Sequence, residues 1–414
     1  MPRHRALSRE QGGRTPGERA LAAGALLPIG VVALALLLAW HAGVFDGELH
    51  DLQVYRFAVE AWRGGEDIYG LLPPTSAGNH LPFLYPPFAV AVFAPLAMLP
   101  WAQAVATIFA VNVVCVVATL YVVARRVWPD LEVRAALVVA AAALPPALLL
   151  EPLRETFTFG QVNLLLMGLV AVDCLAREPW WPRGIGVGLA AAIKLTPAAF
   201  LLFFLLRKDA RASLVAVATM VLATAAGFLV DAGASLRYWG DGAAATSGFS
   251  GSPFLTNQTV EASLARYDLA EPAHTLLWLL LVAVLLAAVV LAMRRSPPEL
   301  ALLLNAALAL LASPTSWSHH WVWVAPAVLV MAGYAGRWWQ RDSVAALPWL
   351  LAATATATLF VLGPFHRVPG GDDAELEWTL AEQLLGNSYT WFTAALVIGY
   401  AVARALRAGS RTAG

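Results

Sequence analysis

Apolar residues follow one another along this chain in long runs that only short polar stretches separate. A helix needs about 20 apolar residues to cross the hydrocarbon core of a bilayer. Because a backbone buried in lipid must satisfy its own hydrogen bonds, each run is expected to be a helix. The pattern predicts an all-α polytopic membrane protein, a bundle of about 10–12 transmembrane helices. The runs cover residues 21–41, 86–124, 133–150, 160–176, 184–206, 213–230, 276–293, 299–316, 320–336, 345–362 and 390–407.

A basic tail precedes the first run. Residues 1–20 contain five arginines, and residues 21–41 are almost uniformly apolar. A secretory signal peptide has a shorter apolar region of about 7–15 residues. The run is therefore predicted to remain in the protein as its first membrane helix, with residues 1–20 as a cytoplasmic tail.

Clusters of arginine and lysine orient the predicted helices, because cytoplasmic loops are enriched in these residues. They place three long loops, 42–85, 231–275 and 363–389, on the non-cytoplasmic side. We predict a single transmembrane domain over 21–407 in the cell membrane, followed by a cytoplasmic tail at 408–414. No repeat of about 20–50 residues stands out, so the chain is one bundle. The orienting clusters are Arg207-Lys208 with Arg211, Arg294-Arg295, Arg337 with Arg341, and Arg404 with Arg407.

The middle of the chain leaves two topologies open. In the first, the arginines at 125–126 and 177–183 lie in the cytoplasm, and residues 151–163 lie outside. The run 184–206 must then begin and end on the cytoplasmic side, as a hairpin broken around Lys194–Pro197, since proline interrupts helices. In the second, 184–206 is one straight span and 151–163 lie inside. We favour the first topology because it brings every polar motif to one face.

Composition supports the assignment to a membrane. The chain is 59% hydrophobic and 13% charged, with a mean hydropathy of +0.67, whereas a soluble domain carries about 25% charged residues. The formal net charge is zero, which gives no sign of a nucleic-acid partner. Cys115 and Cys174 each lie inside an apolar run, so neither a disulfide nor a cysteine metal site is expected.

Polar residues beside the apolar runs carry the candidate chemistry. The first group is HDLQVY at residues 50–55, which opens a predicted short helix that runs to about Arg63 and ends at Gly64-Gly65. Asp51 has two interpretations. Its carboxylate caps the free N–H groups at the start of that helix, or it is a general base held at the membrane surface.

Two further groups lie at predicted membrane boundaries. In FLYPPF at 83–88, the prolines stop the preceding chain and start a helix, and Tyr85 suits the interface, so the motif alone favours a structural role. Gln161 and Asn163, in GQVN at 160–163, begin a predicted span, where unpaired amides are costly. They either pair with neighbouring helices or hydrogen-bond a sugar.

Lys194 lies inside an apolar run and is one of two lysines in the chain, the other being Lys208. An ionisable side chain at membrane depth indicates a functional site by default. Its compact ammonium suits a point-charge partner such as a phosphate. The alternative is that the flexible side chain only reaches back to the membrane interface.

The last group is SPTSWSHHW at 313–321, at a predicted outer boundary. His319 and His320 point to different sides of a helix and have no evident third ligand, so no metal site is expected. Hydrogen bonding to a sugar or phosphate, with stacking on Trp317, fits the group better. A smaller polar patch in the second outer loop consists of Asn257, Gln258 and Thr259 with Arg266.

In this order and at these separations, the motifs resemble those of the family 87 glycosyltransferases. These are polytopic, polyprenol-phosphate-mannose-dependent α-mannosyltransferases of actinobacteria with the C-type (GT-C) fold. The resemblance covers roughly residues 20–405 and implies a GT-C bundle whose outer loops carry short helices. It also implies a hexosyltransferase, and no cofactor is expected. The motifs that carry it are DLQVY at 51–55, YPP at 85–87, GQVN at 160–163, KLTP at 194–197, NQ at 257–258 and SPTSWSHH at 313–320.

The resemblance also implies roles for these residues. Asp51 matches the acidic residue that C-type enzymes place in the first outer loop as catalytic base. It would deprotonate the acceptor hydroxyl while that oxygen attacks the anomeric carbon, with inversion and loss of polyprenyl phosphate. Charge on the leaving phosphate would be met by Lys194, Arg266, His319 or His320. Binding of the acceptor or sugar is expected of Tyr55, Tyr85, Gln161, Asn163, Asn257, Gln258 and Trp317.

The predicted partners are therefore a polyprenyl-phosphate sugar donor, a glycolipid or glycan acceptor and the lipid bilayer. The alternative is a multi-pass transporter of a lipid or sugar without transferase activity. Transporters tend to show paired internal repeats and charged residues at the membrane midplane. This chain shows no such repeat, a single deep lysine and long outer loops, which favours the enzyme.

Overall fold

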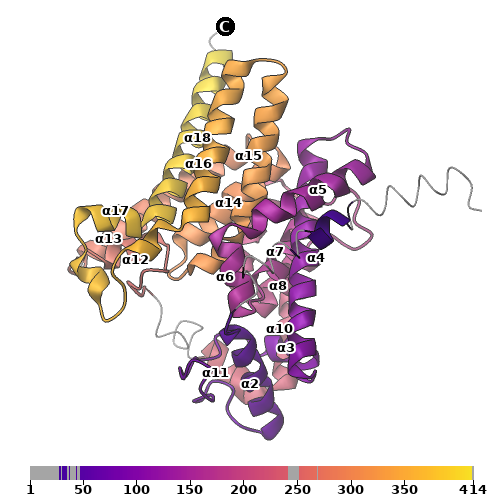
Figure 1. Ribbon diagram of the computed structural model, residues 1–414, viewed down its shortest axis with the longest axis vertical. Helices are drawn as coiled ribbons and strands as arrows, with labels where there is room; N and C mark the ends of the chain where they lie inside the picture. The colour runs from indigo at the N-terminus through magenta and orange to yellow at the C-terminus, as the bar shows by residue number, and fades with distance from the viewer. Residues whose placement is uncertain are drawn as a thin grey trace, which may run out of the picture.

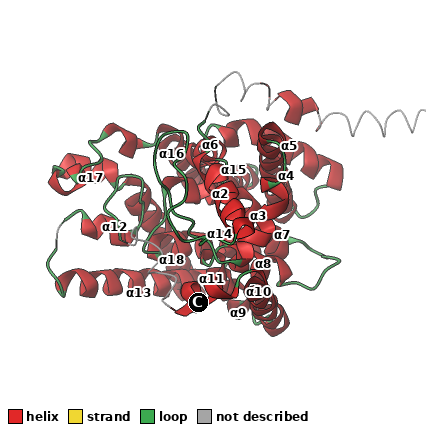
Figure 2. Cartoon of the chain, turned by 90° about the horizontal axis from the view of Figure 1, so that it is seen from below, coloured by secondary structure: helices red, strands yellow, loops and turns green. Residues whose placement is uncertain are grey.

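The computed structural model describes residues 47–240, 251–267 and 269–412, together with a few positions between 28 and 43. The predicted tail at 1–20 lies outside the described residues, and so does most of the predicted span at 21–41. The described residues form helices joined by loops, with one isolated β-bridge between Asn257 and Trp317 (Figure 2). The prediction of an all-α membrane protein is confirmed.

The chain up to residue 240 forms a group of helices in which α4 packs against α5 and α7, and α8 packs against α7 and α10 (Figure 1, indigo to magenta). Its elements are α2 (His50–Gly64), α3 (Phe88–Ala97), α4 (Trp101–Val127), α5 (Val133–Leu148), α6 (Glu151–Phe159), α7 (Asn163–Leu175), α8 (Ile185–Ile193), η1 (Thr196–Phe200), α9 (Leu201–Leu206), α10 (Ala210–Val230) and α11 (Ala232–Gly240).

The remainder of the chain forms a second group, in which α15 packs against α16 and also against α4 of the first group (Figure 1, orange to yellow). Helices α13, α14 and α18 pack against one another. The elements are α12 (Val260–Ala265), α13 (Ala273–Met293), α14 (Pro298–Ala312), η2 (Ser318–Trp323), α15 (Val324–Trp339), α16 (Ser343–Leu362), η3 (Pro364–Arg367), η4 (Ala374–Glu377), α17 (Leu380–Gly386) and α18 (Ser388–Thr412).

Five of the described helices, α4, α10, α13, α16 and α18, are long and apolar enough to cross a membrane. A sixth span is possible if α5 and α6, which meet at an angle of 81°, count as one broken helix. Shorter apolar helices, α3, α7, α14 and the pair η1–α9, stand where further spans are predicted. The last helix continues beyond the predicted boundary at 407, to Thr412.

Prolines cause two breaks that shorten the predicted runs. The run 86–124 is divided into α3 and α4 at Leu99-Pro100, and the residue before a proline is disfavoured in a helix. The run 184–206 is divided where Lys194 adopts an extended conformation, with φ −144° and ψ 130°, just before Pro197 in the first turn of η1. The predicted break at this position is confirmed.

The broken segment returns to the group of arginines from which it starts. Arg183 precedes α8, Arg207 follows α9, and both lie close enough to Arg126 at the end of α4 to interact electrostatically. Arg126 Nε donates to the Leu175 carbonyl (2.7 Å) and Arg183 Nη1 to the Cys174 carbonyl (3.1 Å), both at the end of α7. The structure thus favours the hairpin over a straight span at 184–206.

Candidate active site

Helix α2 presents Asp51 at its second position. Leu49, whose φ of 54° and ψ of 39° are left-handed, turns the chain sharply before the helix, and no side chain caps its first turn. The Leu49 N–H donates to the Thr158 carbonyl oxygen near the end of α6 (3.0 Å). The interpretation of Asp51 as a helix cap is therefore wrong.

Gly160 allows α2 to approach the turn that follows α6. Its φ is 67°, and a Cβ atom added to it would lie 2.8 Å from Leu52 Cβ on α2. Glycine adopts this left-handed conformation without steric cost and leaves room for the neighbouring helix. As a result the next residue, Gln161, lies beside Asp51 although 110 positions separate them in the sequence.

The carboxyl group of Asp51 lies in a poorly hydrated position. Burial raises the pKa of Asp51 to about 6, while the Gln161 side chain, which hydrogen-bonds the carboxylate, and the Lys194 ammonium both lower it. A general base works best when its pKa lies near the operating pH. The environment of Asp51 therefore suits a proton acceptor near neutral pH.

Gln161 connects Asp51 to two tyrosines. Tyr55 Oη and Tyr85 Oη donate to Gln161 Oε1 at 3.0 and 3.2 Å, and the two hydroxyl oxygens are 2.8 Å apart. The ring of Tyr55 stacks on Phe93 with centroids 4.2 Å apart. Asn112 Nδ2 on α4 donates to the Gln161 carbonyl oxygen (3.0 Å). The structure thus brings together three residues predicted to bind sugar and commits their polar atoms to one another.

Lys194 lies at the break between α8 and η1, and its ammonium has three polar neighbours. Nζ donates to Asn163 Oδ1 (3.3 Å), lies 2.9 Å from His320 Nε2 and lies 5.5 Å from the centre of the Tyr85 ring. An ammonium can only donate, so His320 Nε2 accepts and the ring proton of His320 is on Nδ1. The predicted residues Lys194, Asn163 and His320 therefore form one group, in electrostatic contact with Asp51.

The backbone of His319 anchors this group to α6 and α7. Asn163 Nδ2 and Thr156 Oγ1 donate to the His319 carbonyl oxygen at 3.1 and 3.3 Å. The His319 ring packs edge-on against Phe159 and against His320, with centroids 5.2 and 4.7 Å apart. His319 therefore closes the site from the side of η2.

A cavity of about 60 Å³ lies next to Lys194. Both polar and apolar side chains line it, which suits a ligand that joins a charged group to a hydrocarbon chain. The polar residues are Asn163, Lys194, Thr196, Ser316 and His320, and the apolar ones include Leu166, Phe200, Leu310 and Trp323.

Arg266 lies in a separate cluster. Its side chain is 1% exposed, and Nη2 donates to the carbonyl oxygens of Phe254 and Asn257 (2.8 and 2.7 Å). Nε donates to the Pro253 carbonyl (2.8 Å), and Nη1 donates to Asn387 Oδ1. These bonds hold the segment around residues 253–257 against the start of α18. A direct contact between Arg266 and the donor phosphate stays a prediction.

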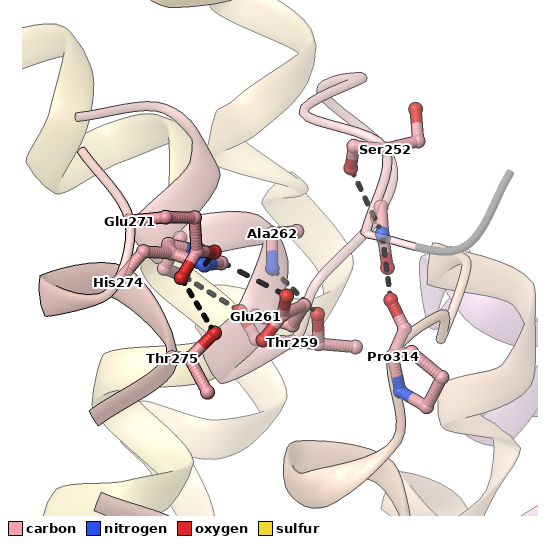
Figure 3. Close-up of polar contacts among 10 residues, drawn as sticks. Ser252, Thr259, Glu261, Ala262, Glu271, His274, Thr275 and Pro314 are labelled. Carbon is pink, nitrogen blue, oxygen red and sulfur yellow. Dashed lines mark hydrogen bonds and ion pairs between the residues drawn. The ribbon is translucent and has the colours of Figure 1, made fainter. Parts of the chain in front are cut away.

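Asn257 and Gln258 join the same outer segment to the loop before η2. Asn257 Nδ2 donates to the carbonyl oxygens of Ser252 (2.9 Å) and Pro314 (3.4 Å), two residues labelled in Figure 3. Its Oδ1 accepts from the Ser316 N–H (2.9 Å). Gln258 Nε2 donates to the Gly386 carbonyl (2.6 Å). Sugar binding by Asn257, Gln258 and Trp317 stays a prediction, and their positions shape the loop 313–317.

Asn112 and Thr156 contribute to the site although the sequence interpretation did not name them. Both are fully buried. Asn112 is an amide inside the 27-residue apolar helix α4, and such residues in membrane helices usually bond across to a neighbour. That signal was available in the sequence. Thr156 gave none, because threonine is unremarkable in a short polar helix.

A chain whose described residues are helical, with five helices long and apolar enough to cross a membrane, is an integral membrane protein. Comparison with known proteins defines the family. The chain matches the family model of glycosyltransferase family 87 over residues 83–314. A polyprenol-phosphate-mannose-dependent alpha-(1-2)-phosphatidylinositol mannoside mannosyltransferase of Mycolicibacterium smegmatis is 40% identical over 371 residues, 84% of this chain and 82% of that protein.

A polyprenol-phosphate-mannose-dependent alpha-(1-2)-phosphatidylinositol pentamannoside mannosyltransferase of the same organism is 32% identical over 351 residues, 80% of this chain and 84% of that protein. A crystal structure of ArnT from Cupriavidus metallidurans bound to undecaprenyl phosphate is similar over 91% of this chain and 77% of that chain, with 16% identity and a TM-score of 0.43. The chain belongs to glycosyltransferase family 87. The resemblance of the motifs is confirmed, and the transporter alternative is not favoured.

Proposed function

We propose that this protein transfers mannose from a polyprenyl-phosphate-mannose donor to a phosphatidylinositol mannoside on the non-cytoplasmic face of the cell membrane. The observation that carries the proposal is the proximity of Asp51, whose pKa of about 6 suits a base, to the partly buried Lys194 ammonium. The names of the relatives supply the donor and acceptor classes. The higher identity to the phosphatidylinositol mannoside enzyme, 40% against 32%, favours that acceptor over the pentamannoside.

In the proposed reaction, Asp51 accepts the proton of an acceptor hydroxyl while that oxygen bonds to the anomeric carbon of mannose. The bond from this carbon to the phosphate oxygen breaks on the opposite side, so the configuration inverts. Polyprenyl phosphate leaves with the bonding electrons. Lys194 meets the charge that develops on the phosphate, because a positioned cation is most effective where water is excluded. Asn163 and His320 accept two of its three protons, and the third is left for a phosphate oxygen.

Two adjoining cavities support a lipid-linked donor. The smaller one carries the polar group around Lys194. A larger apolar cavity of about 390 Å³ lies among α14, α15, α16 and α18 and shares Leu310 and Trp323 with the smaller one. The proposed donor places its phosphate at Lys194 and its hydrocarbon chain past Leu310 and Trp323 into the larger cavity.

The test uses purified protein, radiolabelled polyprenyl-phosphate-mannose and separate acceptors that carry one, two or five mannoses on phosphatidylinositol. We expect label in a product one mannose larger, with a newly formed bond cleaved by an α-mannosidase. Label only in the pentamannoside product would assign the other acceptor. Consumption of donor without transfer to any of the three acceptors would contradict the proposal.

A further inference from the structure

The side-chain amide of Gln161 lies between a carboxylate and two phenols, and its orientation is fixed. Oε1 is 3.3 Å from the Val162 backbone N–H, which can only donate. Tyr55 and Tyr85 also direct hydroxyl groups at the same atom, at 3.0 and 3.2 Å. An amide nitrogen at this position would face the Val162 N–H donor without an acceptor. The oxygen must therefore point to the tyrosines, and the NH₂ group is left for the Asp51 carboxylate.

We propose that Gln161 is a positioning residue for Asp51, and that Tyr55 and Tyr85 act through it by holding its amide in the donating orientation. This inference rests on the proposed function, in which Asp51 is the base. It departs from the expectation that the three side chains bind sugar. Gln161, Tyr55 and Tyr85 are 3%, 1% and 6% exposed, and the hydroxyl groups already bond to the amide and to each other.

Counting the protons shows that the two tyrosines are partly redundant. The two hydroxyl groups have one proton each, so together they can donate two hydrogen bonds. They make three contacts: one with each other, and one from each hydroxyl to Gln161 Oε1. When one hydroxyl donates to the other, the second still donates to Gln161. The chain of donors then runs from phenol to phenol to amide to carboxylate, and bonds in such a chain strengthen one another. Either tyrosine alone can hold the amide.

If the Gln161 amide were reversed, Asp51 would be less effective as a base. With Oε1 toward Asp51, two oxygens that only accept would face each other at a site with little water. The carboxylate would lose a donor that favours its charged form, so its pKa would rise. At neutral pH the population of ionised Asp51 would fall, and its oxygen atoms would no longer be held in one orientation. The tyrosines prevent this reversal without touching the substrate.

The experiment compares purified full-length wild type with Tyr55→Phe, Tyr85→Phe, the double variant, Gln161→Met and Gln161→Glu, all at matched thermal stability. We expect each single Phe variant to keep kcat within about threefold, because one donor remains. The double variant and Gln161→Met should lose about tenfold or more at neutral pH. Their acidic limb in the pH profile of kcat should move to higher pH, while KM for the acceptor changes less than about twofold.

Gln161→Glu separates positioning from packing. The variant keeps the shape of the side chain and both bonds from the phenols, but it replaces the NH₂ donor with a second carboxyl group. Because like charges raise a pKa, the pKa of Asp51 should rise and the acidic limb should move further than in Gln161→Met. A raised acceptor KM with an unmoved limb would assign these residues to sugar binding and overturn the inference. Single Phe variants as impaired as the double variant would overturn the redundancy.

A second readout does not depend on transfer. The carboxyl band of Asp51, isolated as the infrared difference between wild type and Asp51→Asn, gives its protonation directly at each pH. Gln161→Met and the double Phe variant should raise the midpoint of that band. If wild type transfers no mannose, the proposed function fails, and the shift of this midpoint still decides the inference. An unchanged midpoint overturns it whatever the enzyme transfers.

Discussion

At the scale of single residues, the Asp51 carboxylate is the group on which the proposed chemistry depends. We predict that Asp51→Asn lowers kcat by about 100-fold or more, because an amide cannot accept the acceptor proton. Asp51 makes no capping bond in α2, so the thermal stability and the affinity for donor should remain close to wild type. The measurement is the initial rate with labelled donor, beside a melting curve. Near-normal turnover would move the base to another group, His319 or His320 first.

The pH dependence of wild type follows from the same residue. Burial raises the pKa of Asp51 to about 6, above that of an exposed aspartate, so the reactive carboxylate is lost already below this pH. We predict that kcat rises with pH through about pH 6 and falls about tenfold for each pH unit below it. Rates between about pH 4.5 and 8 check this. A limb near the ordinary aspartate value of about 4 would show that Asp51 is not desolvated during turnover.

Lys194 is predicted to contribute to the use of the polyprenyl-phosphate donor rather than to the stability of the fold. Lys194→Met keeps much of the side-chain length and removes the charge, so the rate at limiting donor should fall by about tenfold or more. Because Lys194 also lowers the pKa of Asp51, the acidic limb should move to higher pH in this variant. Arg should rescue only partly, since its planar fork differs from a compact ammonium. Equal donor-dependent rates for Lys, Met and Arg would remove Lys194 from the site.

The sequence identified most of these side chains because charges and amides stand out in apolar runs. It did not show how they are connected. The hydrogen bond from Tyr55 to Gln161 joins residues 106 positions apart, and the bond from Thr156 to the His319 carbonyl joins residues 163 apart. Whether an amide binds a sugar or holds a carboxylate depends on such contacts, and no pattern along the chain encodes them.

At the scale of elements, the junction between α2 and the turn after α6 decides where Asp51 lies. Gly160 and Gly65 both have left-handed φ values, 67° and 72°, but only at Gly160 would a Cβ atom meet another helix. We predict that Gly160→Ala lowers activity by displacing α2 and lowers the melting temperature more than Gly65→Ala. Left-handed strain of about 1–2 kcal/mol is common to both variants, and overpacking adds about 1–3 kcal/mol at Gly160 alone.

The comparison of these two variants isolates the contact with Leu52. Gly65→Ala has nothing within 4 Å of its new Cβ atom, so it should keep wild-type kcat while it loses some stability. Equal activity of the two variants would show that the α2 contact does not position Asp51.

Local signals in the sequence were sufficient to predict the bounds of several helices. Predicted residues 50–63 correspond to α2 at His50–Gly64, since Gly65 ends the helix as a left-handed cap. The break at Lys194–Pro197 was equally local. Hydropathy could not divide the run 86–124, because α3 and α4 are both apolar and only Pro100 marks the boundary.

At the scale of the whole molecule, the site and the arginine group lie at opposite ends of the same helices. Helix α7 begins at Asn163 in the site and ends at Leu175, which accepts a hydrogen bond from Arg126. Its 13 residues extend about 20 Å at 1.5 Å per residue. Since arginines favour the cytoplasmic side, this separation supports a site that faces away from the cytoplasm.

The last prediction tests this orientation and the hairpin together. In a background without Cys115 and Cys174, single cysteines at Ala77 and Asp372 should react with a membrane-impermeant maleimide on intact cells. A cysteine at Glu178 should react only after permeabilisation, because the hairpin puts both Arg183 and Arg207 in the cytoplasm, whereas a straight span at 184–206 would put Glu178 outside. All three positions are exposed, so burial does not explain a failure to react. If Glu178→Cys and Ala77→Cys both react on intact cells, the site lies outside the cytoplasm but the hairpin at 184–206 is excluded. If Ala77→Cys and Asp372→Cys do not react on intact cells, the protein has the opposite orientation in the membrane.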